Sequence, residues 1–403
     1  MSSVYNFWKE TKYQRDIIST WLFFLAFTVY LVGHFVSGTM LANDLPDLFS
    51  YRVTQLSGAI VFVKIFVFDM AFDKNKIKTQ AIVVLLGILL WDICQRAANY
   101  NFFYYYLLAV GAKNIDGRKI LKWFLVLIGM LTIIVFVMAK LQIIPGLAFG
   151  RANSPVIRYA LGMIYPSDLA ARVFYLLLTY VAYRRFKLNI PEYIGAIACT
   201  VFVYEVTDTR LDAALMILLL LSVLFYKYIV KILLFLKPIG ISLLGMLGVF
   251  GSILASYFYH EDNLVLNLVD KVLSGRLKFG HEAFSKYNVT FLGQEIHQIG
   301  NGGIHKSFEN YFYIDSSFLR TLMMNGLLCF TLLMILLIYL VSRFMDQRMY
   351  SLVLFVLFVI LSSIIDQHLT EISFNCLFLL TIANVDFFKD KDAFEYKKNK
   401  MIA

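Results

Sequence analysis

Residues 119–141 read KILKWFLVLIGMLTIIVFVMAKL, and no charged side chain lies between Lys122 and Lys140. An α-helix needs about 20 predominantly apolar residues to cross the hydrocarbon core of a bilayer. Similar stretches recur along the chain of 403 residues, which is 60% hydrophobic and 16% charged, with a mean hydropathy of +0.71. Soluble domains carry about 25% charged residues. The composition excludes a soluble enzyme, a disordered protein and a secreted disulfide scaffold, and it predicts an all-α integral membrane protein.

About twelve apolar stretches are predicted to be transmembrane helices of a single polytopic domain, residues 1–403. The first has no small-residue cleavage site after it, so we expect it to be retained as a helix. The predicted spans are 17–37, 54–72, 78–95, 98–113, 119–141, 166–185, 191–206, 211–230, 238–259, 316–342, 348–365 and 370–388.

The distribution of cations predicts the orientation of these helices. If the N-terminus is cytoplasmic, 23 of the 37 Lys and Arg residues lie in inner segments, and each inner segment has at least two. Cytoplasmic loops of membrane proteins carry such an excess of Lys and Arg. We therefore expect both termini in the cytoplasm. The net charge of +10 then reflects membrane orientation, and nucleic acid is not an expected partner.

Two outer loops are longer than a connection requires. Residues 142–165 form one, and residues 260–315, between predicted helices 9 and 10, form the larger. Loops beyond about 12–15 residues are usually functional or disordered. The larger loop has apolar residues at helical spacing from Leu264 to Leu273, which predicts an amphipathic helix at the membrane surface that ends at Ser274-Gly275.

Arginine residues on the predicted outer side indicate an anionic substrate. All six histidines and several carboxylates are expected on the same side. The planar guanidinium suits bidentate binding of phosphate or pyrophosphate. The alternative is that each Arg pairs with a neighbouring carboxylate or a lipid headgroup. The residues are Arg52, Arg96, Arg151, Arg158, Arg210, Arg276 and Arg320.

Three other charges near or within the spans have structural interpretations. Arg172 follows Asp168 by four residues on one predicted helix, so the two are expected to pair with each other. Lys64 lies in the middle of a span, and Asp69 is five residues away. Lys64 is either half of a structural pair or a contact for a substrate.

Neither a zinc-binding spacing nor a phosphate-binding glycine loop occurs, so no metal or cofactor is predicted.

Three short motifs, together with the topology, resemble the Wzy-type polysaccharide polymerases, relatives of the O-antigen ligases, over roughly residues 140–345. Arg151 and Gly162 are separated by ten residues, as in the family's Arg-x10-Gly motif. Ser274-Gly275-Arg276 is similar to its S-G-R stretch. The segment from Asp315 to Gly326 resembles its H-N-x-x-L…G segment. This sequence departs from the family in having Asp315 in place of His, and in lacking a second Arg-x10-Gly after Arg276.

The resemblance implies a metal-independent, GT-C-like membrane glycosyltransferase that needs no cofactor. Its donor and acceptor would be polyprenyl-pyrophosphate-linked oligosaccharides: an acceptor hydroxyl attacks the anomeric carbon, and the lipid pyrophosphate leaves. The product would be a capsule, exopolysaccharide or O-antigen. The resemblance further implies the bacterial cytoplasmic membrane with an extracytoplasmic active face, membrane lipid as a partner, and a separate chain-length regulator protein.

Roles for individual residues follow from the resemblance and from their chemistry. Asp315 is the predicted general base, a role worth about 10²–10⁴-fold in rate. Asp315 could instead be the N-cap of the following helix. Arg210, which lies between two aspartates, is predicted to act in catalysis, unless these aspartates simply pair with it. The predicted ligands of the pyrophosphate and glycan are Arg151, Arg158, Arg276 and Arg320, with His305 and Glu295 as reserve bases.

Three rival functions remain open. An O-antigen ligase would use the same donor but another acceptor. A lipid-linked oligosaccharide flippase or other transporter would have interrupted helices in matching positions, which the sequence does not indicate. A membrane scaffold would have no reason to gather Arg, His and acidic residues on one side.

Overall fold

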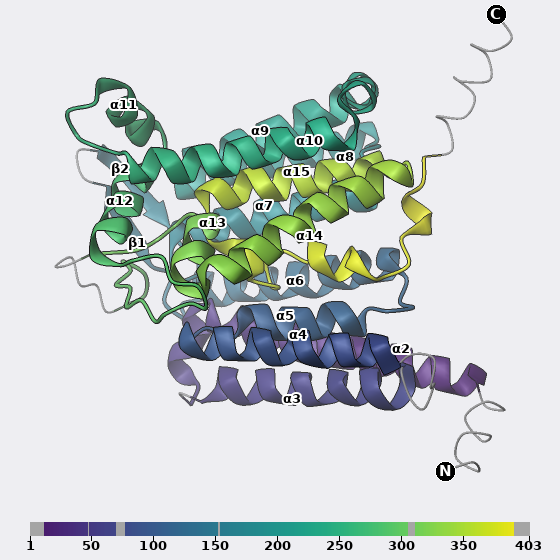
Figure 1. The fold of residues 1–403 in the computed structure, drawn as a ribbon. Helices are drawn as coiled ribbons and strands as arrows, with labels where there is room; N and C mark the ends of the chain where they lie inside the picture. Colours follow the sequence, from purple (N-terminus) through teal and green to yellow (C-terminus); the bar gives the residue numbers. More distant parts are fainter. Residues whose placement is uncertain (1–11, 47, 70–76, 152–153, 305–310, 391–403) are drawn as a thin grey trace, which may run out of the picture.

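A computed structural model describes residues 12–46, 48–69, 77–151, 154–304 and 311–390 (Figure 1). The elements of the first part are α2 (Lys12–Ser37), η1 (Met40–Asp44), α3 (Phe49–Val63) with the π-helix η2 (Lys64–Asp69), α4 (Ile77–Arg96), α5 (Asn101–Gly111), α6 (Gly117–Lys140), β1 (Ala148–Arg151), β2 (Ser154–Tyr159) and α7 (Pro166–Tyr183).

The second part begins with α8 (Ile190–Thr207), α9 (Arg210–Leu224) and α10 (Tyr226–Tyr257). Two short helices follow in the large loop, α11 (Leu264–Val272) and α12 (Arg276–Lys286). The chain continues through α13 (Ser317–Arg320), the π-helix η4 (Thr321–Asn325), α14 (Gly326–Asp346) and α15 (Tyr350–Ile365). It ends in the 3₁₀ turns η5 (His368–Thr370), η6 (Leu377–Thr381) and η7 (Asp386–Phe388).

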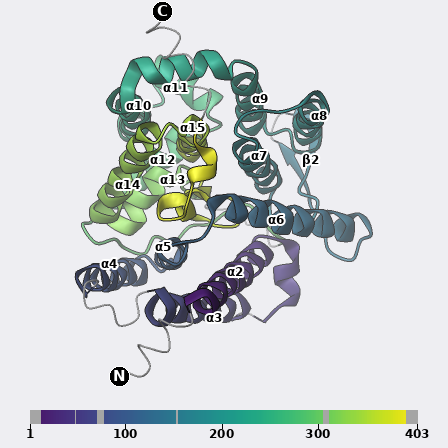
Figure 2. The same cartoon turned by 90° about the vertical axis from the view of Figure 1, so that its right-hand side faces the viewer.

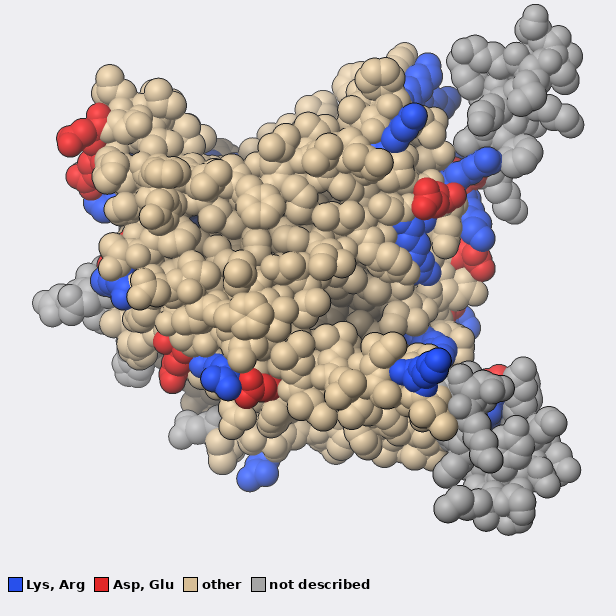
Figure 3. Space-filling view, in the orientation of Figure 1, with Lys and Arg blue, Asp and Glu red and all other residues tan. Residues whose placement is uncertain are grey.

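The molecule is an integral membrane protein. Charged side chains gather at two ends of the surface, and an apolar belt separates them (Figure 3). Seven helical stretches in the described part are long and apolar enough to cross a membrane. The other predicted crossings correspond to segments that are shorter or less apolar, so the number twelve stays a prediction. The seven are Gln14–Ser37, Phe49–Asp69, Ile77–Arg96, Gly117–Lys140, Ile190–Thr207, Tyr226–Tyr257 and Ser317–Asp346.

The two ends of the bundle differ in what they carry. The hairpin β1–β2 and the helices α11 and α12 lie at one end of the bundle (Figure 1, left). We call it the cavity end, because the cavity described in the next subsection opens there. The start of α2 and the turn η7 lie at the opposite end. The first and last described elements therefore lie at the same end of the bundle, and the cytoplasmic location of that end stays a prediction.

The predicted helix 211–230 has different boundaries in the structure, whereas the predicted start of 238–259 coincides with a break in α10. α9 ends at Leu224, and α10 starts at Tyr226 but is broken at Lys237, whose φ of 59° and ψ of 170° are not helical. A residue before proline is excluded from the α region, and proline suits the first turn of a helix, so Pro238 starts a new segment. The first part of α10 runs across the ends of its neighbours (Figure 2).

The prediction of a helix at 370–388 is wrong. This returning segment consists of short 3₁₀ turns and irregular chain, and most of its side chains are buried. Irregular backbone at membrane depth is tolerated where protein surrounds it. Here side chains bond the free backbone groups: Tyr105 Oη accepts from the Phe378 amide at 3.2 Å, and Arg343 donates to the Leu380 carbonyl at 3.1 Å and to the Ala383 carbonyl at 3.3 Å.

The predicted outer loop 142–165 contains a short two-stranded hairpin, and the membrane helices agree with the predicted all-α class. Its strands β1 and β2 pair antiparallel, with Phe149 opposite Arg158. In the larger loop, the residues with helical spacing form α11, and its position at a membrane surface stays a prediction. Its apolar side chains at Leu264, Val265 and Leu268 are exposed. As predicted, it ends before Ser274 and Gly275, which both have positive φ.

Gly326 is the tightest backbone contact in the segment that resembles the family motif. Its φ of 84° and ψ of 170° belong to a region that is open only to glycine, and an added Cβ would lie 2.4 Å from the Gly293 amide nitrogen. We expect Gly326→Ala to lower the free energy of unfolding by ~1–3 kcal/mol. The effect is measured as a lower temperature of thermal unfolding in detergent. Gly129→Ala is the matched control, because a Cβ there meets nothing within 4 Å. Equal melting temperatures for the two variants would contradict this account.

Candidate functional site

A cavity of about 830 Å³ opens at the cavity end of the bundle. Its walls come from distant parts of the chain: α2, the hairpin, the starts of α7 and α9, the large loop, and the chain after α15. The charged and histidine side chains of its lining are His34, Arg158, Asp168, Arg210, Asp212, Arg276, Asp315, His368 and Glu371. Four of them, Arg158, Arg210, Arg276 and Asp315, are residues that the sequence predicts for the site.

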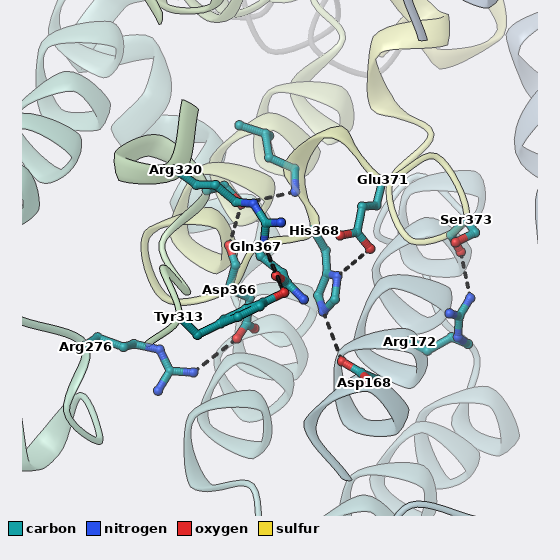
Figure 4. A network of polar contacts seen from close by, with 12 residues as sticks. Asp168, Arg172, Arg276, Tyr313, Arg320, Asp366, Gln367, His368, Glu371 and Ser373 are labelled. Carbon is teal, nitrogen blue, oxygen red and sulfur yellow. Dashed lines mark hydrogen bonds and ion pairs between the residues drawn. The ribbon is translucent and has the colours of Figure 1, made fainter. Parts of the chain in front are cut away.

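Arg276 is held by the end of α15. The positive-φ turn at Ser274-Gly275 places Arg276 at the start of α12. Its Nη2 donates to Oδ1 of Asp366 at 3.2 Å (Figure 4). Nη1 donates to the Leu273 carbonyl at 2.9 Å, and Nε donates to the Ile365 carbonyl. Burial alone lowers the pKa of this guanidinium, but the nearby carboxylates, Asp315 first, outweigh it and raise the pKa. Arg276 is therefore a fixed cation in the wall of the cavity.

Arg320 lies beside the cavity and contacts two residues that line it. Its Nη1 donates to Oη of Tyr313 at 3.0 Å and to Oε1 of Gln367 (Figure 4). The Tyr313 hydroxyl also donates to Gln367. This network joins the large loop to the chain after α15, and it places a positive charge behind the polar wall.

Asp315 lines the cavity and makes no hydrogen bond or ion pair with any residue that the structure describes. The N-cap position of α13 belongs to Ser316, and the Ser317 amide donates to the Asp366 carbonyl at 3.1 Å, so the alternative role for Asp315 is not what the structure shows. Desolvation raises the pKa of this carboxyl, and Arg276 and Arg320 oppose the rise only partly. A half-buried carboxylate with a raised pKa is suited to accept a proton.

The two remaining predicted cations of the cavity have different surroundings. Arg210, at the first position of α9, is exposed to the cavity and forms no ion pair within the described residues, so the suggested network with its flanking aspartates does not form. Arg158 is buried, and its Nε donates to the Thr207 carbonyl at 2.8 Å. Its guanidinium also lies over the Tyr165 ring, 5.5 Å from the centroid.

His368 and the side chains around it form the cavity wall nearest the returning segment. His368 Nδ1 lies 3.0 Å from Oε2 of Glu371, and its Nε2 lies 3.9 Å from Oδ1 of Asp168 (Figure 4). The imidazole stacks on Phe374 with 3.7 Å between the ring centroids. Burial alone lowers the pKa of His368, but the Glu371 carboxylate outweighs it, and the net shift is upward. The arrangement holds the ring in one orientation at the cavity wall.

The expected pair of Arg172 with Asp168 does not form. Arg172 is fully buried between the rings of Phe35 and Phe374, at 4.4 and 4.0 Å from their centroids, and donates to the Ser373 carbonyl at 3.2 Å. Asp168 faces His368 instead. Aromatic faces attract a guanidinium and compete with a carboxylate for it.

The open question about Lys64 is answered by its contacts. Its Nζ pairs with Asp69 Oδ2, both side chains are buried, and Asp69 Oδ1 accepts from Ser19 Oγ at 2.8 Å. This pair lies outside the lining of the cavity and is structural.

The other predicted site residues are not brought to the cavity by any described contact. Glu295 is exposed in the chain after α12 and does not line the cavity. The backbone of Arg151 ends β1, and its side chain is outside the described part. His305 lies outside the described residues.

The large loop covers part of the cavity. Gly300, Asn301 and Gly302 line it, and the Gly303 amide donates to the Ile164 carbonyl of the second outer loop at 3.1 Å. A Cβ on Gly302 would lie 2.4 Å from Cγ2 of Ile164, so only glycine fits this contact. The glycines thus let the two outer loops meet closely over the site.

Four polar residues that follow α15 are not among the predicted site residues, although His368 is one of the histidines expected on the outer side: Asp366, Gln367, His368 and Glu371. The signal was present as a dense polar run in a short connection between two apolar stretches. Ionisable residues near membrane depth usually have a function and pair with another polar group. The partners, Arg276 and Arg320, lie 90 and 47 residues away.

The His368–Glu371 contact predicts a pH dependence of stability. Because the folded-state pKa of His368 is raised above 6.5, the stabilisation is complete below pH 6.5 and is lost as the pH rises through the folded pKa. The stability gap between wild type and Glu371→Gln should therefore shrink with rising pH, measured by thermal unfolding from about pH 5 to pH 9. The same comparison in a His368→Gln background should show no pH-dependent gap. A gap that widens with pH would show that another group is responsible.

No known protein family, curated protein or solved structure shows significant similarity to this chain.

Proposed function

We propose that the protein is a membrane glycosyltransferase that polymerises polyprenyl-pyrophosphate-linked oligosaccharide repeat units into a surface polysaccharide. One observation carries the proposal: three predicted cations and the predicted base line a single cavity, although they come from four separate segments. The expected location is the bacterial cytoplasmic membrane, with the cavity end extracytoplasmic. Membrane lipid and a chain-length regulator protein are the further proposed partners.

The charges of the cavity match the demands of this reaction. Charge builds on the leaving pyrophosphate, and preorganised cations stabilise it where water is largely excluded. Arg210, Arg276 and Arg158 are placed to do so, with Arg320 behind the wall. The acceptor hydroxyl attacks the anomeric carbon, the bond from that carbon to the phosphate oxygen breaks, and the hydroxyl proton passes to Asp315.

The shape and lining of the cavity are suited to a sugar. Aromatic rings stand beside the polar groups: Phe149, Tyr165, Tyr311, Tyr313 and Phe374. Binding sites for organic ligands combine such rings with a few fixed polar groups and have volumes of about 300–1,000 Å³. The lipid tail of the donor would lie against the apolar belt between the helices.

One observation favours the transport alternative. α10 is broken at Lys237, and the segment from Ser317 to Asp346 is interrupted by a π-helix before Gly326. Transporters often bind their substrates at interrupted helices. The break at Lys237 lies at the start of the predicted helix 238–259, whereas the sequence did not indicate the interruption before Gly326. A lipid-linked oligosaccharide flippase is therefore the second candidate, alongside the ligase that shares the proposed donor.

A gel of lipid-linked and surface glycans from cells that lack the gene tests these candidates. Loss of the ladder with persistence of single repeat units supports polymerisation. Full ladders that stay on the lipid carrier would assign the protein as a ligase. Repeat units trapped on the inner leaflet would assign it as a flippase and contradict the proposed site chemistry.

A further inference from the structure

The first part of α10, residues 226–236, has no part in the site described above. Its axis runs across the bundle and not along it: the segment is seen end-on in Figure 1 and from the side at the top of Figure 2. It joins α9 to the rest of α10 at the end of the bundle opposite the cavity end. We call this segment the rim helix. A helix that lies across the ends of membrane-spanning neighbours is placed to run along a membrane surface.

The rim helix is fixed at both ends. At its start, Oη of Tyr226 donates to Oδ2 of Asp390 at 2.8 Å, and Nη2 of Arg185 donates to Oδ1 of the same carboxylate at 3.2 Å. At its end, Lys237 has a φ of 59° and a ψ of 170°, a conformation that is nearly exclusive to glycine, and Pro238 follows. Such a conformation persists only where the surrounding structure holds it. The orientation of the rim helix is therefore a built feature of the fold.

One face of the rim helix is apolar and has no protein cover. The opposite face packs on the bundle through the buried side chains of Tyr226 and Leu233. Tyr228, Ile232 and Phe235 recur at intervals of four and three residues, so they form one row along the helix. They are 65%, 55% and 84% exposed. A continuous exposed apolar row of this kind marks a surface that contacts a membrane or a partner.

Lysines beside the apolar row give this surface a positive charge. Lys227 and Lys231 lie one turn apart on the neighbouring row, and Lys237 follows at the break; all three are exposed. Nζ of Lys231 lies 5.5 Å from the centroid of the Tyr228 ring, so the charged and apolar rows adjoin. None of the three lysines forms an ion pair with a described residue. Residues 213–260 contain neither Asp nor Glu, so the local sequence supplies no counterion either.

We propose that the rim helix binds the surface of a membrane leaflet that contains anionic phospholipids. The apolar row enters the boundary between headgroups and acyl chains, and the lysines extend to the headgroup phosphates, as in other basic amphipathic helices. The end of the bundle that carries the rim helix is the one expected in the cytoplasm, and cytoplasmic leaflets carry anionic lipids. This binding surface does not depend on the proposed function, because the cavity opens at the other end.

Quenching of tryptophan fluorescence by brominated lipids tests the proposal. The full-length protein is placed in vesicles of phosphatidylcholine with a minor share of phosphatidylglycerol, and one of the two lipids carries bromine on its acyl chains. Phe235→Trp reports on the rim helix after the wild-type signal is subtracted. Leu247→Trp, at a position 67% exposed in the later part of α10, is the matched control. We expect brominated phosphatidylglycerol to quench the Phe235→Trp signal by more than its share of the bilayer, and the Leu247→Trp signal in proportion to that share.

Removal of the lysine charges should abolish the preference for the anionic lipid. A lysine near an anionic membrane surface favours binding by up to about 5-fold, so Lys227→Gln with Lys231→Gln should lose most of the enrichment at Phe235→Trp. Lys140→Gln with Lys271→Gln removes two exposed lysines at the cavity end and should keep the enrichment.

Three results would overturn the proposal. The first is no quenching of the Phe235→Trp signal by either brominated lipid, which would mean that a protein partner or water covers the apolar row. The second is quenching in proportion to the share of each lipid, which would leave a membrane contact without a preference for anionic headgroups. The third is an enrichment that survives the loss of Lys227 and Lys231. Because the assay contains no glycan, its failure is separate from a failure of the proposed polymerase activity.

Discussion

Asp315→Asn is expected to lower the rate of polymer formation by about 10²–10⁴-fold, the usual contribution of a positioned general base. The amide has nearly the same size as the carboxyl and cannot accept the hydroxyl proton. Since Asp315 makes no hydrogen bond or ion pair within the described part of the chain, its loss should leave the fold intact. The rate is measured as glycan ladder formed per unit time, with unfolding temperature recorded in parallel.

The pH profile separates a base from a structural residue. Because the pKa of Asp315 is raised, wild-type activity should fall as the pH drops through that raised pKa and the carboxyl becomes protonated. Asp92→Asn is the control, because the only described ion pair of Asp92 is the surface pair with Arg96 at 2.9 Å. Full polymer length and rate in Asp315→Asn would exclude the base role.

Arg210→Ala is expected to reduce polymer formation by about 10²–10³-fold, the effect of removing one donor that stabilises developing charge. Arg210 is the most direct probe of the cations, because it is exposed to the cavity and holds no described partner. Truncating Arg276 would leave the buried Asp366 carboxylate without its ion-pair partner. A loss of activity in such a variant could then come from lower stability as well as from weaker substrate binding.

Two further variants define what Arg210 does. Arg210→Lys keeps the charge but not the bidentate fork, so intermediate activity is expected if two phosphate oxygens are bound together. Arg96→Ala removes an exposed Arg whose only described ion pair is with Asp92, and it should behave as wild type. Equal activity of Arg210→Ala and wild type would remove Arg210 from the site.

The spans that the sequence predicts best are those whose apolar runs coincide with regular helices. The predicted 17–37, 119–141 and 348–365 correspond to α2, α6 and α15. The failure at 370–388 has a clear cause: apolar composition reports burial, and a buried irregular chain has the same composition as a buried helix. The irregular chain differs from a helix in that side chains of other elements, such as Arg343 of α14, form hydrogen bonds with its backbone.

The site was predictable only in part for a similar reason. Arg276 and Asp315 stood out because they lie in a polar loop, where a charge is unexplained by local sequence. Asp212 looked like a flanking counterion of Arg210, whereas it is buried at the cavity wall and forms no ion pair with a described residue. Contacts between charges on separate helices depend on packing, which periodicity does not specify.

The most direct test of the central claim uses the purified protein in lipid vesicles with a polyprenyl-pyrophosphate-linked oligosaccharide as the only substrate. The account predicts a ladder of longer lipid-linked glycans, with one polyprenyl pyrophosphate released for each unit added. Asp315→Asn and Arg210→Ala should form both products at the reduced rates given above, and Asp92→Asn should form them at the wild-type rate. Bound substrate that stays a single unit with the wild-type protein, or a ladder that both site variants make at the wild-type rate, would contradict it.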